Sequence, residues 1–264
     1  PDEAVGLFGV LNGGVVQDLT LTNVNISVSN GECVGGAIGL MVNGATASGI
    51  TVGAQGGSDT ITAVRGLGGV VGRMTITGGI LDCTNYAKIV GTSTDSGNVG
   101  GIVGAAYYTA NNSWMIISGC KNYGEVSNKC MGVGGIAGLS AAQVEGCENY
   151  GAVSGGSECA DGAAGTSIGG IVGEQQNAGY ISGCTNSGNV TNGDADAFGT
   201  GGIVGWVRYN GAAGDYPRKE IIEVTNNINS GNVTGGGSAG GIVGHLYNAG
   251  IVTGNENTAQ SISS

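Results

Sequence analysis

The chain has 264 residues, of which 58 are glycine and only 2 are proline, and its formal net charge at pH 7 is −11. This composition excludes collagen, because no Gly-X-Y period accompanies the glycine, and it argues against disorder, because 40% of the residues are hydrophobic. Nucleic acid is not an expected partner, since an acidic chain has no basic stripe to displace counterions, and no run of 18 apolar residues predicts a membrane span.

A short glycine motif recurs eight times along the chain. Looser copies read GLFG, GGAIG, GGVVG and GGIAG, and the strict form GGIVG stands at 100–104, 169–173, 201–205 and 240–244. The second glycine of each copy lies 30 to 39 residues from the next, at Gly6, Gly36, Gly69, Gly101, Gly135, Gly170, Gly202 and Gly241. A period of about 33 residues that tolerates insertions indicates a solenoid or a propeller.

A second motif runs in phase with the first. It reads ILDCTNYAKIV, ISGCKNYGEVS, VEGCENYGAVS and ISGCTNSGNVT at 80–90, 117–127, 144–154 and 181–191. EVTNNINSGNVT (223–234) keeps the tail, with Asn227 in the cysteine column, and LTNVNISVS (21–29) is a degenerate first copy. An asparagine column follows from the alignment: Asn85, Asn122, Asn149, Asn186, Asn229 and Asn257. Stacked amides can bond to one another along such a column.

Short apolar runs bounded by glycine or asparagine are typical of strands and turns rather than of helical repeats. A propeller blade needs about 40 or more residues, so one coil of a β-solenoid fits the period better. We therefore predict an all-β, right-handed parallel β-helix of about eight coils, forming one domain over 1–264. Each coil is expected to hold three strands, GGIVG, ISGC and NVT. The glycine pair would turn a corner where φ can be positive, and a trailing glycine such as Gly104 would begin the next bend.

These motifs resemble the GLUG repeat. That repeat occurs in arrays within large bacterial surface proteins, including adhesin-like proteins and the non-catalytic regions of some IgA-specific metallopeptidases. The resemblance covers nearly the whole chain, and it implies a β-helix-like stack at the bacterial cell surface with no catalytic residues or cofactor. Because the sequence enters a repeat within its first six residues, we expect an excerpt of a longer secreted protein with flanking domains.

The seven cysteines fall into two groups. Cys83, Cys120, Cys147 and Cys184 share one column, where we expect small thiols buried in the core, because in-register neighbours rarely reach disulfide geometry. Cys33, Cys130 and Cys159 lie off this column. Cys130 and Cys159 fall in successive coils and are candidates for a disulfide bond.

Catalytic signatures are weak. The alternative of a polysaccharide-acting β-helix enzyme, a lyase or glycosidase, needs clustered carboxylates, but the acidic residues fall at different phases of the repeat. His245 is the single histidine, so an HExxH zinc site is impossible and no metal site is predicted. Asp194 and Asp196 could contribute to a calcium-binding loop, but the further acidic ligand of an EF-hand is missing, and we favour an ordinary polar turn. Thr-x-Thr rows, which an ice-binding face requires, do not recur in phase.

The longest insertions follow the GGIVG motif, at 105–116 and 206–220. They carry the candidate ligand-binding residues Tyr107, Tyr108, Trp114, Trp206, Arg208, Tyr209 and Tyr216. Aromatic side chains on loops can stack on sugar rings or anchor a protein interface, and they can equally fold back to cover an apolar flank. We therefore expect a non-catalytic, extracellular adhesin or spacer that presents loops to a glycan or host protein. A passive stalk is a further alternative.

Overall fold

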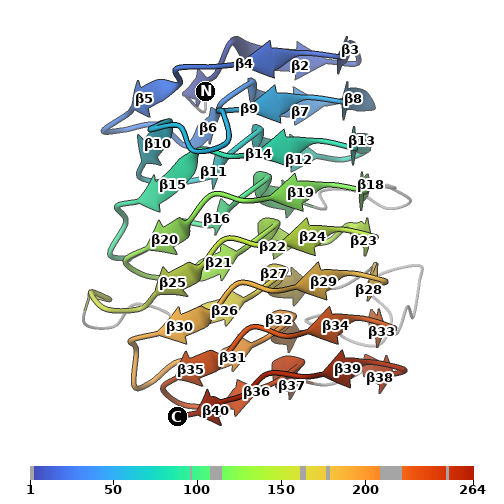
Figure 1. Cartoon of the computed structure of the whole chain (residues 1–264). Coiled ribbons are helices and arrows are strands. Elements are labelled where there is room, and N and C mark those ends of the chain that lie inside the picture. Colours follow the sequence, from blue (N-terminus) through green and yellow to red (C-terminus); the bar gives the residue numbers. More distant parts are fainter. Residues whose placement is uncertain are drawn as a thin grey trace, which may run out of the picture.

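The computed structural model describes residues 3–95, 97–107, 115–160, 165–176, 179–208, 222–247 and 250–264. Every regular element in these ranges is a β-strand, and the strands form five parallel sheets of eight strands each (Figure 1). Five consecutive strands, one from each sheet, complete one coil. The predicted all-β solenoid of eight coils is confirmed.

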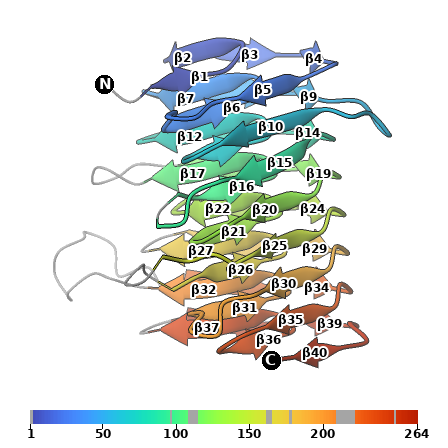
Figure 2. The same cartoon turned by 90° about the vertical axis from the view of Figure 1, so that its left-hand side faces the viewer.

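The coil is right-handed, as predicted. In Figure 1 the chain descends from coil 1, crossing the back of the molecule from left to right and the front from right to left. Figure 2, which views the molecule from the left side of Figure 1, places β25 (Val153–Gly155) and β26 (Ser167–Gly169) in front, β27 (Val172–Gln176) at the left and β29 (Thr185–Asn186) at the right. Descending with this rotation produces a right-handed helix.

Sheets A and B flank the corner made by the glycine motif. Sheet A contains β1 (Ala4–Val5), β6 (Cys33–Gly35), β11 (Leu67–Gly68), β16 (Val99–Gly100), β21 (Gly132–Gly134), β26 (Ser167–Gly169), β31 (Gly199–Gly201) and β36 (Ala239–Gly240). Sheet B contains β2 (Phe8–Asn12), β7 (Ile38–Val42), β12 (Val71–Thr75), β17 (Val103–Tyr107), β22 (Ala137–Ser140), β27 (Val172–Gln176), β32 (Val204–Arg208) and β37 (Val243–Tyr247).

Sheets C and D carry the second motif up to its asparagine. Sheet C contains β3 (Val15–Gln17), β8 (Ala45–Ser48), β13 (Gly78–Leu81), β18 (Met115–Ser118), β23 (Gln143–Glu145), β28 (Tyr180–Ser182), β33 (Ile222–Thr225) and β38 (Gly250–Thr253). Sheet D contains β4 (Thr20–Leu21), β9 (Thr51–Val52), β14 (Thr84–Asn85), β19 (Lys121–Asn122), β24 (Glu148–Asn149), β29 (Thr185–Asn186), β34 (Ile228–Asn229) and β39 (Glu256–Asn257).

Sheet E holds the tail of the second motif. It contains β5 (Asn25–Ser27), β10 (Thr60–Ala63), β15 (Lys88–Gly91), β20 (Val126–Asn128), β25 (Val153–Gly155), β30 (Val190–Asn192), β35 (Val233–Gly235) and β40 (Ile262–Ser263). Its inward column consists of isoleucine and valine in every coil, from Ile26 and Ile61 to Val233 and Ile262. Burial of these branched side chains supplies the apolar driving force for stacking.

Two details of the predicted coil are wrong. Each coil has five strands rather than three, and GGIVG is a corner: Gly100 ends β16, whereas Val103 and Gly104 begin β17. Gly100 and Gly101 are also absent from the positive-φ residues of the described chain. Glycine is required here because an added Cβ at Gly101 would lie 2.2 Å from the carbonyl oxygen of Gly135 and 2.3 Å from Cγ of Asn122. Steric exclusion therefore explains the glycine, not backbone conformation.

The asparagine column is buried directly against these glycines. The second glycine of the same coil faces each amide in six coils, from Gly69 and Asn85 to Gly241 and Asn257. Each amide nitrogen from Asn85 to Asn229 donates one hydrogen bond of 2.9 Å to the carbonyl two residues on, and one of 2.8 Å to Oδ1 of the next asparagine. The predicted amide ladder is confirmed, and the glycines leave the space that it occupies.

The cysteine column is also confirmed as a core feature. Cys83, Cys120, Cys147 and Cys184 are free thiols with no exposed surface. Burial, as the largest influence, raises the pKa of Cys120 well above its usual value. Asn227 continues the column, donating from Nδ2 to the carbonyl of Ile181 at 3.0 Å. These groups fill the interior of the stack and have no exposed surface.

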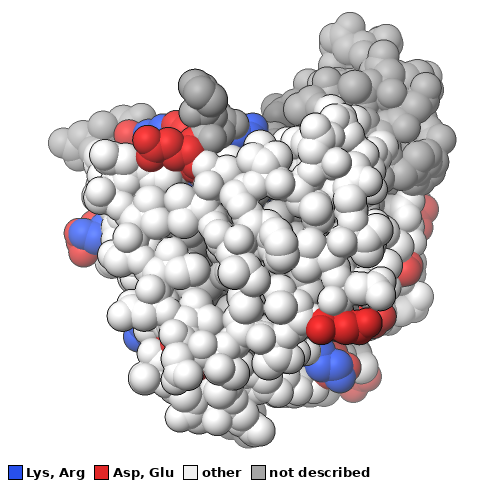
Figure 3. All heavy atoms as spheres, turned by 90° about the horizontal axis from the view of Figure 1, so that it is seen from above, with Lys and Arg blue, Asp and Glu red and all other residues white. Residues whose placement is uncertain are grey.

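The two ends of the stack are apolar. Coil 1 exposes Leu7, Phe8, Val10 and Val15. Coil 8 exposes Leu246, Tyr247, Ile251, Val252 and Ile262. Seen from above coil 1, charged side chains lie at the perimeter and the end face is uncharged (Figure 3).

Candidate functional site

The predicted ligand-binding residues fall partly within the described chain. Trp206 and Arg208 belong to β32, and Tyr107 ends β17. The other four candidates, Tyr108, Trp114, Tyr209 and Tyr216, lie outside the described residues. The structure therefore shows the beginnings of both insertions, and both start on sheet B as the repeat alignment predicts.

Trp206 is packed rather than displayed. Its ring lies 4.2 Å from the ring of Phe198 between centroids, with a 26° angle between the planes, and the guanidinium carbon of Arg208 lies 4.5 Å from the Trp206 centroid. Only 9% of Trp206 is exposed. A ring held in this way anchors the start of the insertion to sheet B and leaves little surface for stacking on a sugar.

A buried carboxylate belongs to the same cluster. Glu174 pairs across the sheet with Trp206, and its Oε1 lies 2.9 Å from Nε of Arg208 and accepts a 2.7 Å hydrogen bond from Gln176. Burial raises the pKa of Glu174, while Gln176 and Arg208 act in the opposite direction. The ion pair compensates a charge that would otherwise be costly to bury, which is a structural role.

His245 occupies the next position of this column. It pairs across the sheet with Trp206, its ring centroid lies 6.3 Å from that of Trp206, and its Nδ1 lies 3.0 Å from the carbonyl oxygen of Phe198. His245 therefore lies on the same face of sheet B as Trp206. The side chain is half-buried.

A second aromatic feature, which the sequence analysis did not single out, lies at the corner between sheets D and E. Tyr86, Tyr123 and Tyr150 each follow an asparagine of the ladder, and their rings form a stack that we call the tyrosine ladder. Centroids are separated by 4.9 Å and 4.7 Å, with interplanar angles of 13° and 4°. Tyr123 and Tyr150 are 39% and 45% exposed. The dipeptide NY, which recurs in three consecutive copies of the second motif, is the sequence pattern that could have predicted this stack.

Next to this corner, sheet E presents a column of hydroxyl groups. Its outward positions are Ser27, Thr62, Val90, Ser127, Ser154, Thr191, Thr234 and Ser263. All eight side chains are half-buried or exposed. A groove of about 370 Å³ runs beside the column, lined by Val90, Ser127, Ser154 and Thr191 among others.

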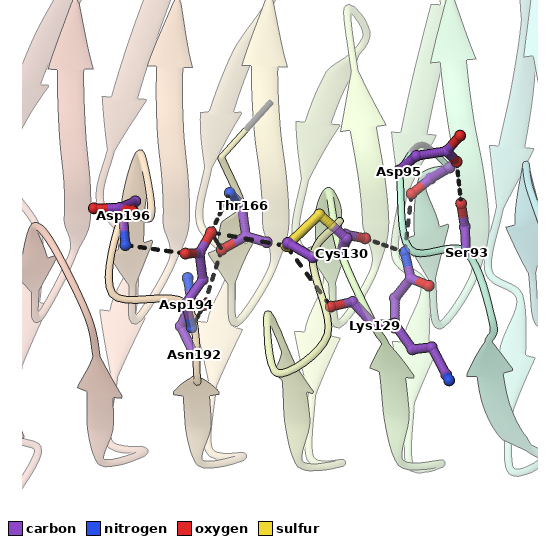
Figure 4. The surroundings of a disulfide bond; sticks show 11 residues. Ser93, Asp95, Lys129, Cys130, Thr166, Asn192, Asp194 and Asp196 are labelled. Carbon is purple, nitrogen blue, oxygen red and sulfur yellow. Dashed lines mark hydrogen bonds between the residues drawn. A yellow bond between two sulfur atoms is a disulfide. The ribbon is translucent and has the colours of Figure 1, made fainter. Parts of the chain in front are cut away.

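The connections between sheets E and A contain the Cys130–Cys159 disulfide, which confirms that pairing and links coils 4 and 5 (Figure 4). Asp194, one of the two calcium candidates, lies beside it. Its Oδ2 accepts hydrogen bonds from the backbone N–H and the hydroxyl of Thr166, and its Oδ1 accepts one from the N–H of Asp196. The carboxylate thus organises the turn. Within the described ranges, no group of three or more His, Cys, Asp and Glu side chains is placed to hold a metal ion.

Other carboxylates serve local contacts in separate coils. Asp59 accepts hydrogen bonds from the backbone N–H groups of Val24 and Ala54, and Glu145 accepts one from the Tyr180 hydroxyl. These groups do not form a paired acid and base.

No protein-family model, curated protein or solved structure matches the chain. In the portion of the chain that the structure describes, no helix has the length and apolarity needed to cross a membrane.

Proposed function

We propose that the chain is a non-catalytic binding module of a secreted bacterial surface protein, which displays exposed side chains at fixed steps along a rigid solenoid to a glycan or host protein. The observation that carries the proposal is the contrast between columns. Inward columns are closed by apolar packing, amides and thiols, whereas the outward column of sheet E keeps a hydroxyl in seven of its eight positions.

A hydroxyl column suits a ligand that is itself repetitive. Adjacent strands stand about 4.8 Å apart, so the hydroxyls of successive coils form a regular row of donors and acceptors. The groove beside Ser127, Ser154 and Thr191 adds a concave wall to this row. An extended polymer could contact several coils at once, and weak individual contacts would then combine.

The cellular setting is part of the same proposal. The eight copies of the GLUG-like motif each occupy their own coil, which supports membership of that repeat family. The acidic and uncharged-polar composition and the disulfide both suit an extracellular location. Adhesion to a surface polymer is the role that best uses an exposed, rigid and repetitive face.

The test is binding of the purified chain to an array of neutral and acidic glycans and extracellular-matrix proteins. The wild type is compared with a sheet E variant, Ser127→Val, Ser154→Val and Thr191→Val, and with a control on sheet C, Ser182→Val and Thr225→Val. We expect a ligand whose affinity falls at least tenfold in the sheet E variant and less than twofold in the control. Absence of binding to every probe would overturn the proposed function in favour of a passive stalk.

A further inference from the structure

The tyrosine ladder ends within the solenoid. In coils 6, 7 and 8 the position of Tyr150 is taken by Ser187, Ser230 and Thr258. The backbone continues in register, since the N–H of Ser187 donates to the carbonyl of Asn149 at 2.8 Å and that of Ser230 donates to Asn186 at 2.8 Å. The face of the Tyr150 ring that points toward coil 6 therefore meets a small hydroxymethyl group instead of another ring.

The vacant positions have the right dimensions for a six-membered ring. Rings within the ladder are separated by 4.7 to 4.9 Å, which is one coil step. Two consecutive serines leave two such steps, about 9.6 Å, below Tyr150. A ring stacked on Tyr150 would continue the spacing that the ladder already uses.

The orientation of the Tyr150 ring is fixed. Its hydroxyl donates a hydrogen bond to Glu148, and Glu148 is also 3.2 Å from Nζ of Lys121. Tyr123 packs on the opposite face of the ring. A ring that is already held in place loses little conformational entropy when a ligand stacks on it.

The groups around the open face are neutral. Thr185, Ser187 and Asn189 alternate along coil 6, each half-buried or exposed, and the Ser230 hydroxyl lies 3.3 Å from that of Ser187. The two charged groups beside the Tyr150 hydroxyl, Glu148 and Lys121, form an ion pair with each other. Hydroxyl and amide groups next to an aromatic face match a pyranose, whose C–H face stacks on aromatic rings and whose hydroxyls take hydrogen bonds.

We propose that the open face of Tyr150, together with Thr185, Ser187 and Asn189, is a subsite for a pyranose ring of a neutral glycan. This site deepens the binding function proposed above and rests on it. The subsite adjoins the hydroxyl column of sheet E, because Asn189 immediately precedes β30. A glycan chain stacked at Tyr150 would extend directly onto that column.

The other end of the ladder supplies a matched control. In coil 2 the corresponding position is Gly53, which has φ +81° and is followed by a longer connection to Asp59 and β10. Tyr86 is half-buried beneath it, less exposed than Tyr150. Replacing Tyr86 removes a ladder ring without altering the open face.

The experiment measures binding of neutral hexasaccharides of glucose, mannose and galactose by saturation-transfer NMR and calorimetry. Four proteins are compared: wild type, Tyr150→Ser, Ser187→Tyr and Tyr86→Ser, each with its fold checked by circular dichroism. Tyr150→Ser removes the platform, whereas Ser187→Tyr keeps it and covers it with another ring. We expect at least one hexasaccharide to bind, at least tenfold weaker binding in both of these variants, and less than a twofold change in Tyr86→Ser.

Two results would overturn the subsite without touching the broader function. One is a hexasaccharide that binds wild type, Tyr150→Ser and Ser187→Tyr equally. The other is a wild type that binds no neutral hexasaccharide but binds an acidic glycan, a matrix protein or the cation tetramethylammonium. Failure of the chain to bind any probe on the broad array would instead remove the proposed function itself.

Discussion

Asn149 and Tyr150 are consecutive residues, but the side chain of Asn149 is buried and that of Tyr150 is exposed. Asn149 points inward, has no exposed surface and belongs to a column that stays asparagine through six coils. Tyr150 points outward, and its column changes from tyrosine to serine and threonine. The inward position is constrained by the glycine opposite and by the amides above and below it, whereas the outward position can vary without breaking the stack. The repeated asparagine therefore identifies a position that holds the fold together, and the candidate site lies where the tyrosine column ends.

The largest loss of stability is expected from replacing Gly135, the glycine opposite Asn149. In Gly135→Ala, the new Cβ would lie 2.1 Å from the carbonyl oxygen of Gly170 and 2.3 Å from Cγ of Asn149. Because backbone atoms cannot yield, we expect failure to fold or a loss of more than about 4 kcal/mol in the free energy of unfolding, measured by urea denaturation. Gly79→Ala, where no neighbour is nearer than 3.5 Å, is the control and should change stability by less than about 1 kcal/mol. Wild-type stability in Gly135→Ala would contradict the steric account.

The next largest effect concerns the disulfide between coils. Cys130 and Cys159 are 29 residues apart. The double variant Cys130→Ser, Cys159→Ser should lower the free energy of unfolding by about 3 kcal/mol, because the unfolded chain without the cross-link has more conformational entropy. Dithiothreitol should lower the melting temperature of the wild type to that of the double variant and leave the variant unchanged. An unchanged wild-type melting temperature, with thiol counting showing that the bond is reduced, would count against this prediction.

A smaller effect is expected in the tyrosine ladder. Tyr123 stacks on two rings and Tyr86 on one ring within the ladder. Aromatic pairs contribute roughly 0.5–1.5 kcal/mol each, so Tyr123→Ser should cost about twice as much as Tyr86→Ser, about 2 kcal/mol against 1. Urea denaturation of both variants measures the ratio. Equal losses would show that stacking does not determine the contribution of these residues.

The smallest change is in acidity rather than stability. The hydrogen bond to Glu148, as the main cause, raises the pKa of Tyr150 to about 12. Since an ionised carboxylate stabilises the neutral phenol, Glu148→Gln should lower the Tyr150 pKa toward its ordinary value of 10.0. Ultraviolet difference titration against a Tyr150→Phe protein isolates this tyrosine from the others. A Tyr150 pKa that does not move in Glu148→Gln would show that the hydrogen bond is not maintained.

Inward columns were predictable from the sequence because their identity repeats with the coil. Cys120 could be assigned to the core and Asn122 to a column of stacked amides, and the Cys130–Cys159 pair could be named as a candidate. Five strands per coil could not be predicted, since strands of two residues such as β14 carry no periodicity of their own. The role of glycine at Gly101 was missed because the clash involves Asn122, a residue on the opposite wall of the coil.

The candidate site was less predictable for a related reason. Trp206 was an obvious aromatic candidate, but its packing depends on Phe198 and Arg208, and neither contact follows from the repeat alignment. The open face of Tyr150 arises from Ser187, a residue that is ordinary in itself. Because coils 5 and 6 pair in register, Ser187 takes the position next to Tyr150, where a further tyrosine would have continued the ladder.

The central claim is that inward columns specify the fold and outward columns are free for binding, and a comparison of two neighbouring substitutions tests it most directly. Asn149→Asp preserves shape but removes the two hydrogens given to Asn186 and Gly151, and it buries a charge. Urea denaturation should show a loss of about 4 kcal/mol or more in the free energy of unfolding for Asn149→Asp, against about 1 kcal/mol for Tyr150→Ser. Losses that agree within about 1 kcal/mol, or a larger loss for Tyr150→Ser, would contradict the account.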